Sequence, residues 1–484
     1  MANRKDVEDI HVKMQDDMNR PLIQHRKINH EVSEDHNTSN NNGPLGVVLL
    51  STLVAVLGSY EFGSCVGYSA PAQSAIREDL GLSLQEYSLF GSILNIGAMI
   101  GAITSGHIVD CLGRKGGMRV AAAFGITGWI AIYLSKSSPL LDTGRFLTGY
   151  GSGVFSYVVP IYVAEIAPKN IRGGLATLNQ LMIVIGASVA FVAGTTLTWR
   201  MLALTGIIPC LLQLLGLFYI QESPRWLAQN GNEKEFENAL RKLRGDETDI
   251  SEEAAEIKNY IESLQHLPKA RMLDLFQRRY LKSVIVGNGL MLIQQFGGAN
   301  GIGFYLSETL VAAGFPSGKV GTILFAFFQI PTTTLGAFLM DKCGRRPLLI
   351  VSAIGTFLGC FLVGVSFYLK GNGVLLQWIP ILVLAGVLLY TGSFSIGMGA
   401  VPWVIMSEIF PINIKGAAGS LVNLIHWSAS WAVSYTYNFL FDWNAAGTYF
   451  LYSGFCAAGA LFAVKLVPET KGRTLEEIQA SMNS

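Results

Sequence analysis

Charged side chains are scarce in this sequence. They make up 14% of the 484 residues, whereas a soluble domain usually carries about 25%. Half of the chain is apolar, and its mean hydropathy is +0.40. A soluble protein this apolar could not cover its surface with polar groups, but a protein that faces lipid does not need to. The formal net charge of +1 argues against a nucleic-acid partner, which would favour a strongly basic face.

Catalytic and metal-binding patterns are also missing. The chain has six cysteines, and none forms a CxxC pair or a metal-ligand spacing, so we expect neither a disulfide framework nor a metal site. GxSxG, HExxH and Walker motifs do not occur, and Gly149-Tyr-Gly-Ser-Gly153 lies within an apolar stretch instead of a strand-turn-helix unit. These absences argue against an enzyme, and we expect no cofactor.

The first 44 residues contain no apolar core. They are charged and rich in asparagine, which predicts a disordered tail and no cleavable signal peptide. Asn37-Thr38-Ser39 fits a glycosylation sequon, which would be a chance match in a cytosolic tail. Asp16-Asp17-Met-Asn-Arg-Pro-Leu22-Ile23 resembles an acidic dileucine sorting signal.

Long apolar segments dominate the rest of the chain. A helix needs roughly 20 apolar residues to cross about 30 Å of hydrocarbon. On that basis the sequence predicts twelve transmembrane helices, near 46–68, 88–109, 117–135, 142–163, 176–196, 200–220, 281–306, 318–340, 347–369, 378–404, 417–440 and 446–466.

These segments predict an all-α membrane protein made of two six-helix halves. The expected divisions are a cytosolic tail at 1–44, a first half at 45–220, a linker at 221–279, a second half at 280–466 and a cytosolic tail at 467–484. Within the linker, Glu233–Arg244 and Ser251–Leu264 have helical periodicity and dense charge, so we expect two short amphipathic helices.

Lysine and arginine are distributed unevenly between the two sets of short loops. If the N-terminus is cytosolic, the cytosolic loops carry about twice as many as the opposite loops, as the positive-inside rule requires. We therefore expect both termini and the linker on the cytosolic side.

Three sequence patterns occur twice and in the same order. Asp110-Cys-Leu-Gly-Arg114-Lys115 returns as Asp341-Lys-Cys-Gly-Arg345-Arg346. Glu165-Ile-Ala-Pro-Lys-Asn-Ile-Arg172-Gly returns as Glu408-Ile-Phe-Pro-Ile-Asn-Ile-Lys415-Gly. Glu222-Ser-Pro-Arg225 has a looser echo in Glu469-Thr-Lys-Gly-Arg473. Because the patterns fall at corresponding helix ends, they indicate a duplicated six-helix half with pseudo-symmetry.

The repeated charges predict a set of gate contacts at the cytosolic helix ends. Opposite charges there can pair in one state and release in another, which biases an equilibrium between two rigid arrangements. The positive-inside rule explains the basic residues but not the repeated acids. The predicted gate residues are Asp110, Arg114, Glu165, Arg172, Asp341, Arg345, Arg346, Glu408 and Lys415.

From about residue 47 onward the sequence resembles the sugar porter family of the major facilitator superfamily. Besides the repeats, the motifs are Gly144-Arg145-Phe-Leu-Thr-Gly149-Tyr-Gly, Pro160-Ile-Tyr-Val-Ala-Glu165, Gln294-Gln295-Phe-Gly-Gly-Ala-Asn300, Pro402-Trp403 and Pro468-Glu-Thr-Lys-Gly-Arg473-Thr. Tyr60-Glu61-Phe-Gly-Ser-Cys65 is similar to the plant early-responsive-to-dehydration-six-like monosaccharide transporters. The resemblance implies the major facilitator fold, monosaccharide transport and a vacuolar membrane, with the plasma membrane second.

Carboxamides and tryptophans are the candidate substrate-binding residues. A sugar needs groups that both donate and accept hydrogen bonds, and carboxamides do so without a charge to desolvate. Between helices, Gln and Asn can also serve as structural glue, so sequence alone leaves both roles open. The resemblance implies a sugar site formed by Gln180, Gln294, Gln295, Asn300, Trp403 and Trp427.

Two departures from the family pattern lie near these residues. Pro402 with Gly397 and Gly399 should weaken the tenth helix, although one of the two family prolines is Ala400 here. The family's asparagine beside Trp427 is His426 here, which predicts either altered selectivity or a satisfied polar residue between helices.

The sequence contains features of both facilitated diffusion and proton-coupled transport. Proton-coupled relatives carry an acid that pairs with the arginine matching Arg145, and Cys65 stands at that acid's position, which favours facilitated diffusion. Glu61 lies one helical turn earlier on the same face, so it could pair with Arg145 or bind a proton. Proton coupling therefore stays open, as do a polyol or inositol substrate and a non-transporting receptor. A monomer suffices for this architecture.

Overall fold

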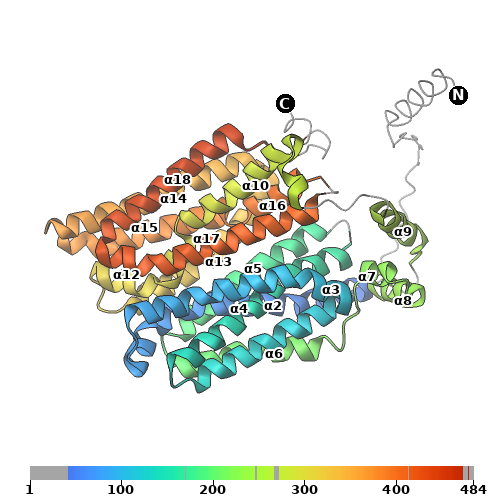
Figure 1. The fold of residues 1–484 in the computed structure, drawn as a ribbon, viewed down its shortest axis with the longest axis horizontal. Coiled ribbons are helices and arrows are strands. Elements are labelled where there is room, and N and C mark those ends of the chain that lie inside the picture. The colour runs from blue at the N-terminus through green and yellow to red at the C-terminus, as the bar shows by residue number, and fades with distance from the viewer. Residues whose placement is uncertain are drawn as a thin grey trace. The chain divides into compact units, whose positions relative to one another are not determined.

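The computed structural model describes residues 42–168, 171–245, 248–265, 272–411, 414–471 and 478. The predicted tail and both of its short motifs lie outside the described residues, apart from its last three positions, which belong to the first helix. Helices and short turns make up this described part, and no strand occurs in it (Figure 1).

The first half contains five long helices. They are α2 (Asn42–Leu80), α3 (Leu84–Leu134), α4 (Ser138–Ile166), α5 (Arg172–Ala193) and α6 (Trp199–Gly216). The 51-residue α3 is broken at Gly113, whose φ of 79° interrupts the helical backbone. It therefore accounts for two of the predicted spans, 88–109 and 117–135. A glycine suits this point because other residues adopt positive φ at a cost.

The linker forms a small helical unit (Figure 1). It comprises α7 (Pro224–Gln229), α8 (Glu233–Arg244) and α9 (Ser251–Gln265), whereas the short η1 (Met272–Phe276) packs against helices of the second half. Helices lie at both predicted positions, and the buried side chains of Phe236 and Leu240 on α8 and Ile257 on α9 join them in one apolar cluster. The ends of the long helices nearest to this unit are called the linker end below, and the opposite ends are called the far end.

The described part of the second half contains nine helices and two irregular interruptions. The helices are α10 (Arg278–Phe296), α11 (Ala299–Phe304), α12 (Leu306–Ala313), α13 (Gly318–Cys343), α14 (Arg345–Gly371), α15 (Ile379–Ser393), α16 (Val401–Ile409), α17 (Lys415–Trp443) and α18 (Ala445–Leu466), with η2 (Leu376–Trp378) and the π-helical turn η3 (Phe394–Met398) between them. The segment predicted as one span at 281–306 is divided into α10 and α11 because Gly298 has a φ of 91°, and α12 follows a second break at Tyr305. The predicted weak point in the tenth span is confirmed by η3 and by the break before α16.

Among the described residues, nine helices are long and apolar enough to cross a membrane. Because α3 holds two spans, they supply ten of the twelve predicted crossings. The other two are α10 to α12 and α17, whose polar side chains lower their hydropathy. Gln294 and Gln295 lie on α10, and His426, Ser430 and Ser434 lie on α17. The two least apolar spans are thus the ones that carry most of the predicted substrate-binding amides and their partners.

Helices of the two halves contact each other along α3 and α17 and along α5 and α13. Two hydrogen bonds cross from α17 to α3 at the far end. Asn95 Nδ2 donates to Ser434 Oγ at 3.1 Å, and Asn438 Nδ2 donates to Ser88 Oγ at 2.9 Å. All four side chains are buried, so these bonds hold the two halves together where water is excluded.

Candidate functional site

A row of carboxamides begins at the end of α10. Gln294 and Gln295 are each only 3% exposed. Gln294 Nε2 donates to the backbone carbonyls of Met398 at 2.6 Å and Gly399 at 3.1 Å, which are the groups released where η3 ends. Gln295 Nε2 in turn lies 3.4 Å from Gln294 Oε1. The broken tenth span therefore fixes the direction in which the first amide of the row points.

Asn300 completes this row because α10 is broken before it. The left-handed backbone at Gly298 turns the chain, and a Cβ there would lie 2.6 Å from the ring of Tyr452. Asn300 Nδ2 donates to Gln295 Oε1 at 2.7 Å and also contacts Ser430 Oγ. The sequence predicted two amides facing one space at two heights, whereas the break brings them into direct contact.

Aromatic rings form the wall next to the amides. The His426 ring lies between Trp403, at 4.9 Å between centroids, and Trp427, at 5.2 Å. Phe62 of α2 contacts Trp427 at 6.0 Å, so residues of both halves meet here. The buried Trp427 Nε1 has no hydrogen-bond partner among the described residues. Such a donor is costly to leave unpaired unless a ligand uses it.

Gln180 lies on α5, in the other half. It is half-buried, and no hydrogen bond joins it to another described residue. The structure thus brings Gln294, Gln295 and Asn300 into one network with the two tryptophans alongside, and leaves Gln180 free to contact a ligand. These residues offer neutral donors, neutral acceptors and apolar faces, which is the chemistry that a sugar ring needs. Their role in binding stays a prediction.

Glu61 and Arg145 are both fully buried but do not form an ion pair. One oxygen of Glu61, Oε1, accepts from Cys65 Sγ at 3.0 Å and from Trp129 Nε1 at 3.1 Å, while Oε2 has no partner among the described residues. Arg145 Nη2 donates to Ser69 Oγ, and its guanidinium lies 5.2 Å from the centre of the Phe90 ring. The expectation that the carboxylate would contact Arg145 is therefore not met in this conformation.

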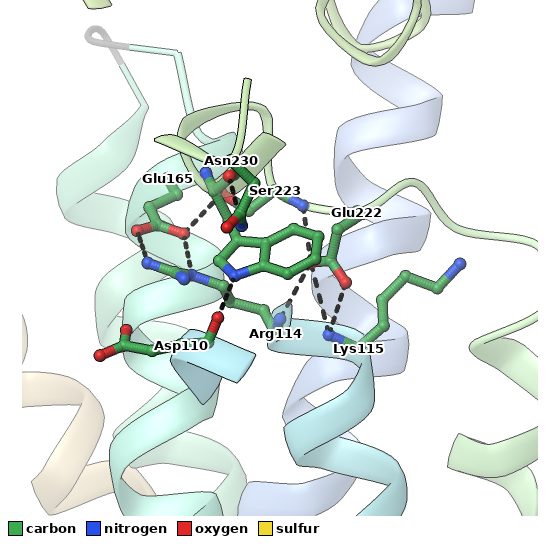
Figure 2. A network of polar contacts seen from close by, with 8 residues as sticks. Asp110, Arg114, Lys115, Glu165, Glu222, Ser223 and Asn230 are labelled. Carbon is green, nitrogen blue, oxygen red and sulfur yellow. Dashed lines mark hydrogen bonds and ion pairs between the residues drawn. The ribbon is translucent and has the colours of Figure 1, made fainter. Parts of the chain in front are cut away.

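The gate charges of the first half form a compact network at the linker end (Figure 2). Arg114 donates to Glu165 through Nε and Nη2, both at 2.7 Å, in a two-bond pair whose side chains are 10% and 11% exposed. Ser223 Oγ donates to the same carboxylate at 2.6 Å. Paired, bidentate bonds of this kind are among the stronger polar contacts in proteins. The network ties α3 and α4 to the start of the linker.

The second half repeats this arrangement in a looser form. Arg345 Nη2 donates to Glu408 Oε1 at 3.3 Å, and the second carboxylate oxygen has no partner among the described residues. Arg346 contacts the carbonyl of Val464 through Nη2. The pseudo-symmetry predicted from the repeats therefore extends to the contacts, with fewer bonds in the second half.

Two further predicted gate residues, Asp110 and Lys415, form no ion pair with a described residue. Asp110 is exposed, its carboxylate forms no ion pair with a described residue, and its backbone carbonyl accepts from Trp226 Nε1 at 3.0 Å instead. Lys415 is exposed and likewise has no ion pair in the described part. The side chains of Arg172 and Asp341 lie outside the described residues.

Sequence reasoning missed the position of Glu222 and Glu469 in these networks. Glu222 Oε1 accepts from the backbone N–H of Arg114 at 3.1 Å, and Oε2 accepts from that of Lys115 at 3.1 Å (Figure 2). Glu469 accepts in the same way from Arg345 and Arg346, both at 3.1 Å. Each carboxylate caps the helix that begins after the positive-φ glycine, where free N–H groups and the helix dipole favour an anion. Their repetition in the sequence was the signal.

The two capping carboxylates have opposite pKa shifts. Burial raises the pKa of Glu222 above 4.5, although backbone N–H groups of Ser223, Lys115 and Arg114 oppose the shift. For Glu469, burial also acts to raise the pKa, but backbone donors from Lys471, Arg345, Arg346 and Thr470 outweigh it and lower the pKa. The difference arises because Glu222 is more deeply buried.

Comparisons with known proteins agree with this geometry. The family described as "Sugar (and other) transporter" matches residues 20–482. Sugar transporter ERD6-like 16 of Arabidopsis thaliana is 61% identical over 465 residues, covering 96% of this chain and 95% of that protein. Sugar transporter ERD6-like 7 of the same plant is 59% identical, covering 90% and 94%.

Solved structures give the same result for the fold. The proton:xylose symporter XylE bound to 6-bromo-6-deoxy-D-glucose aligns with a TM-score of 0.74 at 28% identity, covering 91% of this chain and all of that chain. The inward open conformation of the xylose transporter XylE from E. coli aligns with a TM-score of 0.75 at 30% identity, covering 90% and 99%.

Proposed function

The chain belongs to the sugar transporter family and has the major facilitator fold, and on this basis we propose that it carries a monosaccharide, a hexose or a pentose, by alternating access. The family consists of transporters and not of enzymes. The central observation is the uncharged amide row Gln294, Gln295 and Asn300 beside Trp403 and Trp427. Gln180, half-buried on α5 of the first half, is the further substrate contact that this proposal includes.

Facilitated diffusion is the mechanism that this proposal favours. Arg145, which an acid neutralises in proton-coupled relatives, has no carboxylate in contact here, and its Nε and Nη1 atoms have no partner among the described residues. With Cys65 in place of that acid, the sugar gradient alone would drive net flux.

Counterflow in liposomes tests the substrate class. Purified protein is reconstituted at equal pH on both sides, and uptake of labelled glucose is measured against internal glucose, fructose, xylose or inositol. Exchange with the three monosaccharides is expected. Exchange of labelled inositol, with no exchange of labelled glucose, fructose or xylose, would replace the proposal by a polyol transporter, and sugar binding without exchange would indicate a receptor.

Proton coupling is a second candidate, and the environment of Glu61 favours it. A fully buried carboxylate that accepts from a thiol and an indole, with no cation in contact, is costly to keep ionised. Glu61 could therefore carry a proton between states in which its surroundings differ. Sugar uptake against the sugar's own gradient, driven by a pH gradient and abolished in Glu61→Gln, would establish proton coupling. If Glu61→Gln takes up sugar as the wild type does, the result supports facilitated diffusion.

The gate network supplies the conformational part of the proposal. Arg114–Glu165 and Arg345–Glu408 stabilise the helix ends within each half in one state and loosen as the halves rotate. We place both termini and the linker in the cytosol, with halves at 45–220 and 280–466, and favour the vacuolar membrane over the plasma membrane. Reaction of an engineered cysteine in α8 with an impermeant reagent, in sealed vesicles of known orientation, tests the sidedness.

A further inference from the structure

His426 occupies a defined place at the end of the amide row. Its ring is 9% exposed and is held edge-on between Trp403 and Trp427. Its Nδ1 lies 3.3 Å from Nε2 of Gln295. A ring in T-shaped contact with two indoles has little freedom to turn, so packing fixes the atom that it presents to Gln295.

The hydrogen bonds of the row determine which of these two atoms donates. Gln294 gives its Nε2 hydrogens to the carbonyls of Met398 and Gly399, so its Oε1 faces the row as an acceptor. Gln295 Oε1 accepts from Asn300, which leaves Gln295 Nε2 pointing at Gln294 Oε1 and His426 Nδ1. A donor at this position requires an unprotonated nitrogen opposite it.

From this geometry we propose that His426, as the neutral tautomer with its proton on Nε2, sets the orientation of the Gln295 carboxamide and thereby the sugar selectivity of the site. His426 is a positioning residue here, because it acts through Gln295. His426 Nδ1 is the second acceptor beside Gln295 Nε2, at 3.3 Å, next to Gln294 Oε1 at 3.4 Å. Its loss weakens the preference for this orientation, so the amide turned by half a turn, with donor and acceptor exchanged, becomes populated. A sugar hydroxyl would then meet the wrong partner. The proposal rests on monosaccharide transport as the function.

The tautomer can be measured without transport. Full-length protein labelled with nitrogen-15 histidine is reconstituted in lipid, and the signals of its seven histidines are recorded by solid-state NMR. The signals of His426 are those lost in His426→Asn. We expect an unprotonated Nδ1 and a protonated Nε2. A protonated Nδ1 in the ligand-free protein would overturn the proposal whether or not any sugar is transported.

Three substitutions separate orientation from packing. His426→Phe keeps a ring between the two indoles but removes the acceptor. His426→Asn places an oxygen near the position of Nδ1, and His426→Gln places its amide farther out. We expect His426→Phe to raise KM for the best monosaccharide about ten-fold with kcat changed less than about two-fold. His426→Asn should retain KM near the wild-type value, while His426→Gln should resemble His426→Phe.

The matched controls are Thr436→Val, an exposed position on the same helix, and Gln295→Ala. Thr436→Val should leave KM unchanged. In Gln295→Ala, adding His426→Phe should raise KM no further, because the amide that it orients is gone. An unchanged KM in His426→Phe, or equal losses in His426→Phe and His426→Asn, would contradict the proposal. Absence of transport by the wild-type protein would contradict the proposed function and leave the NMR result to decide the tautomer.

Discussion

Single residues decide whether the amides of the predicted sugar site contact one another. Gln294, Gln295 and Asn300 were candidates from the sequence because carboxamides are unusual in apolar spans, and the family resemblance implied their role in binding. Their direct contact was not, since it depends on the positive φ of Gly298, which a helical pattern does not reveal. Trp129 was missed for a related reason. A single tryptophan in an apolar span predicts only a packing role, and its Nε1 is brought to Glu61 by the fold.

Gly298→Ala tests the role of this backbone break. A Cβ at Gly298 would both strain a residue at φ 91° and press on the Tyr452 ring, so we expect a loss of about 1–3 kcal/mol in stability together with weaker sugar binding. Gly303→Ala is the matched control, because a Cβ there has nothing within 4 Å. Equal thermal unfolding midpoints for the two variants in detergent would show that the break imposes no constraint.

At the scale of elements, the repeated motifs assemble into two similar caps on α3 and α14. The sequence predicted that acids and bases of the repeated motifs can pair at these helix ends, and Arg114–Glu165 and Arg345–Glu408 are the pairs that the structure shows. Asp110 contributes its backbone carbonyl here, which accepts from Trp226 Nε1 at 3.0 Å, and a charge pattern in the sequence does not indicate such a backbone contact. The second cap has the weaker pair, so Glu165→Gln should destabilise the protein more than Glu408→Gln does.

The capping acids predict opposite pH dependences. The pKa of Glu222 is raised in the folded protein, so its contribution to stability is complete below its unfolded-state pKa and is lost as pH rises through the folded value. The pKa of Glu469 is lowered, so its contribution is present above its unfolded-state pKa and is lost as pH falls through the folded value.

Unfolding midpoints measured across the acidic range check these signs. The stability advantage of wild type over Glu222→Gln should shrink as pH rises, and that over Glu469→Gln should grow. If the stability advantage over both variants changed with pH in the same direction, the same factor, either burial or backbone hydrogen bonding, would dominate the pKa shift of both carboxylates.

At the scale of the whole molecule, length and composition were sufficient for twelve spans in two halves, because the bilayer imposes the length of each helix. The contacts between the halves could not be predicted, since Asn95 and Ser434 are far apart in sequence and neither has a distinctive motif. Those bonds bear on alternating access. They hold α3 to α17 at the far end and must break when that end opens.

Asn95→Ala removes one of these bonds and leaves Ser434 Oγ with its own bond to the Ser430 carbonyl at 2.8 Å. A lost hydrogen bond of about 0.5–1.5 kcal/mol should favour opening at the far end by roughly two- to ten-fold. Hydrogen–deuterium exchange around 84–95 should become faster, whereas Thr436→Val should leave it unchanged. Unaltered exchange in Asn95→Ala would mean that these bonds do not restrain opening.

The most direct test of the account is the concentration dependence of labelled monosaccharide uptake into liposomes by wild type, Gln295→Ala and Gln213→Ala. Gln213 is an equally buried carboxamide, but it donates to the carbonyl of Ala55 within the first half, away from the proposed site. The account predicts saturable uptake by wild type, a KM raised at least about ten-fold in Gln295→Ala, and an unchanged KM for the folded fraction of Gln213→Ala. Equal KM values in all three proteins would contradict the claim that the amide row binds the sugar.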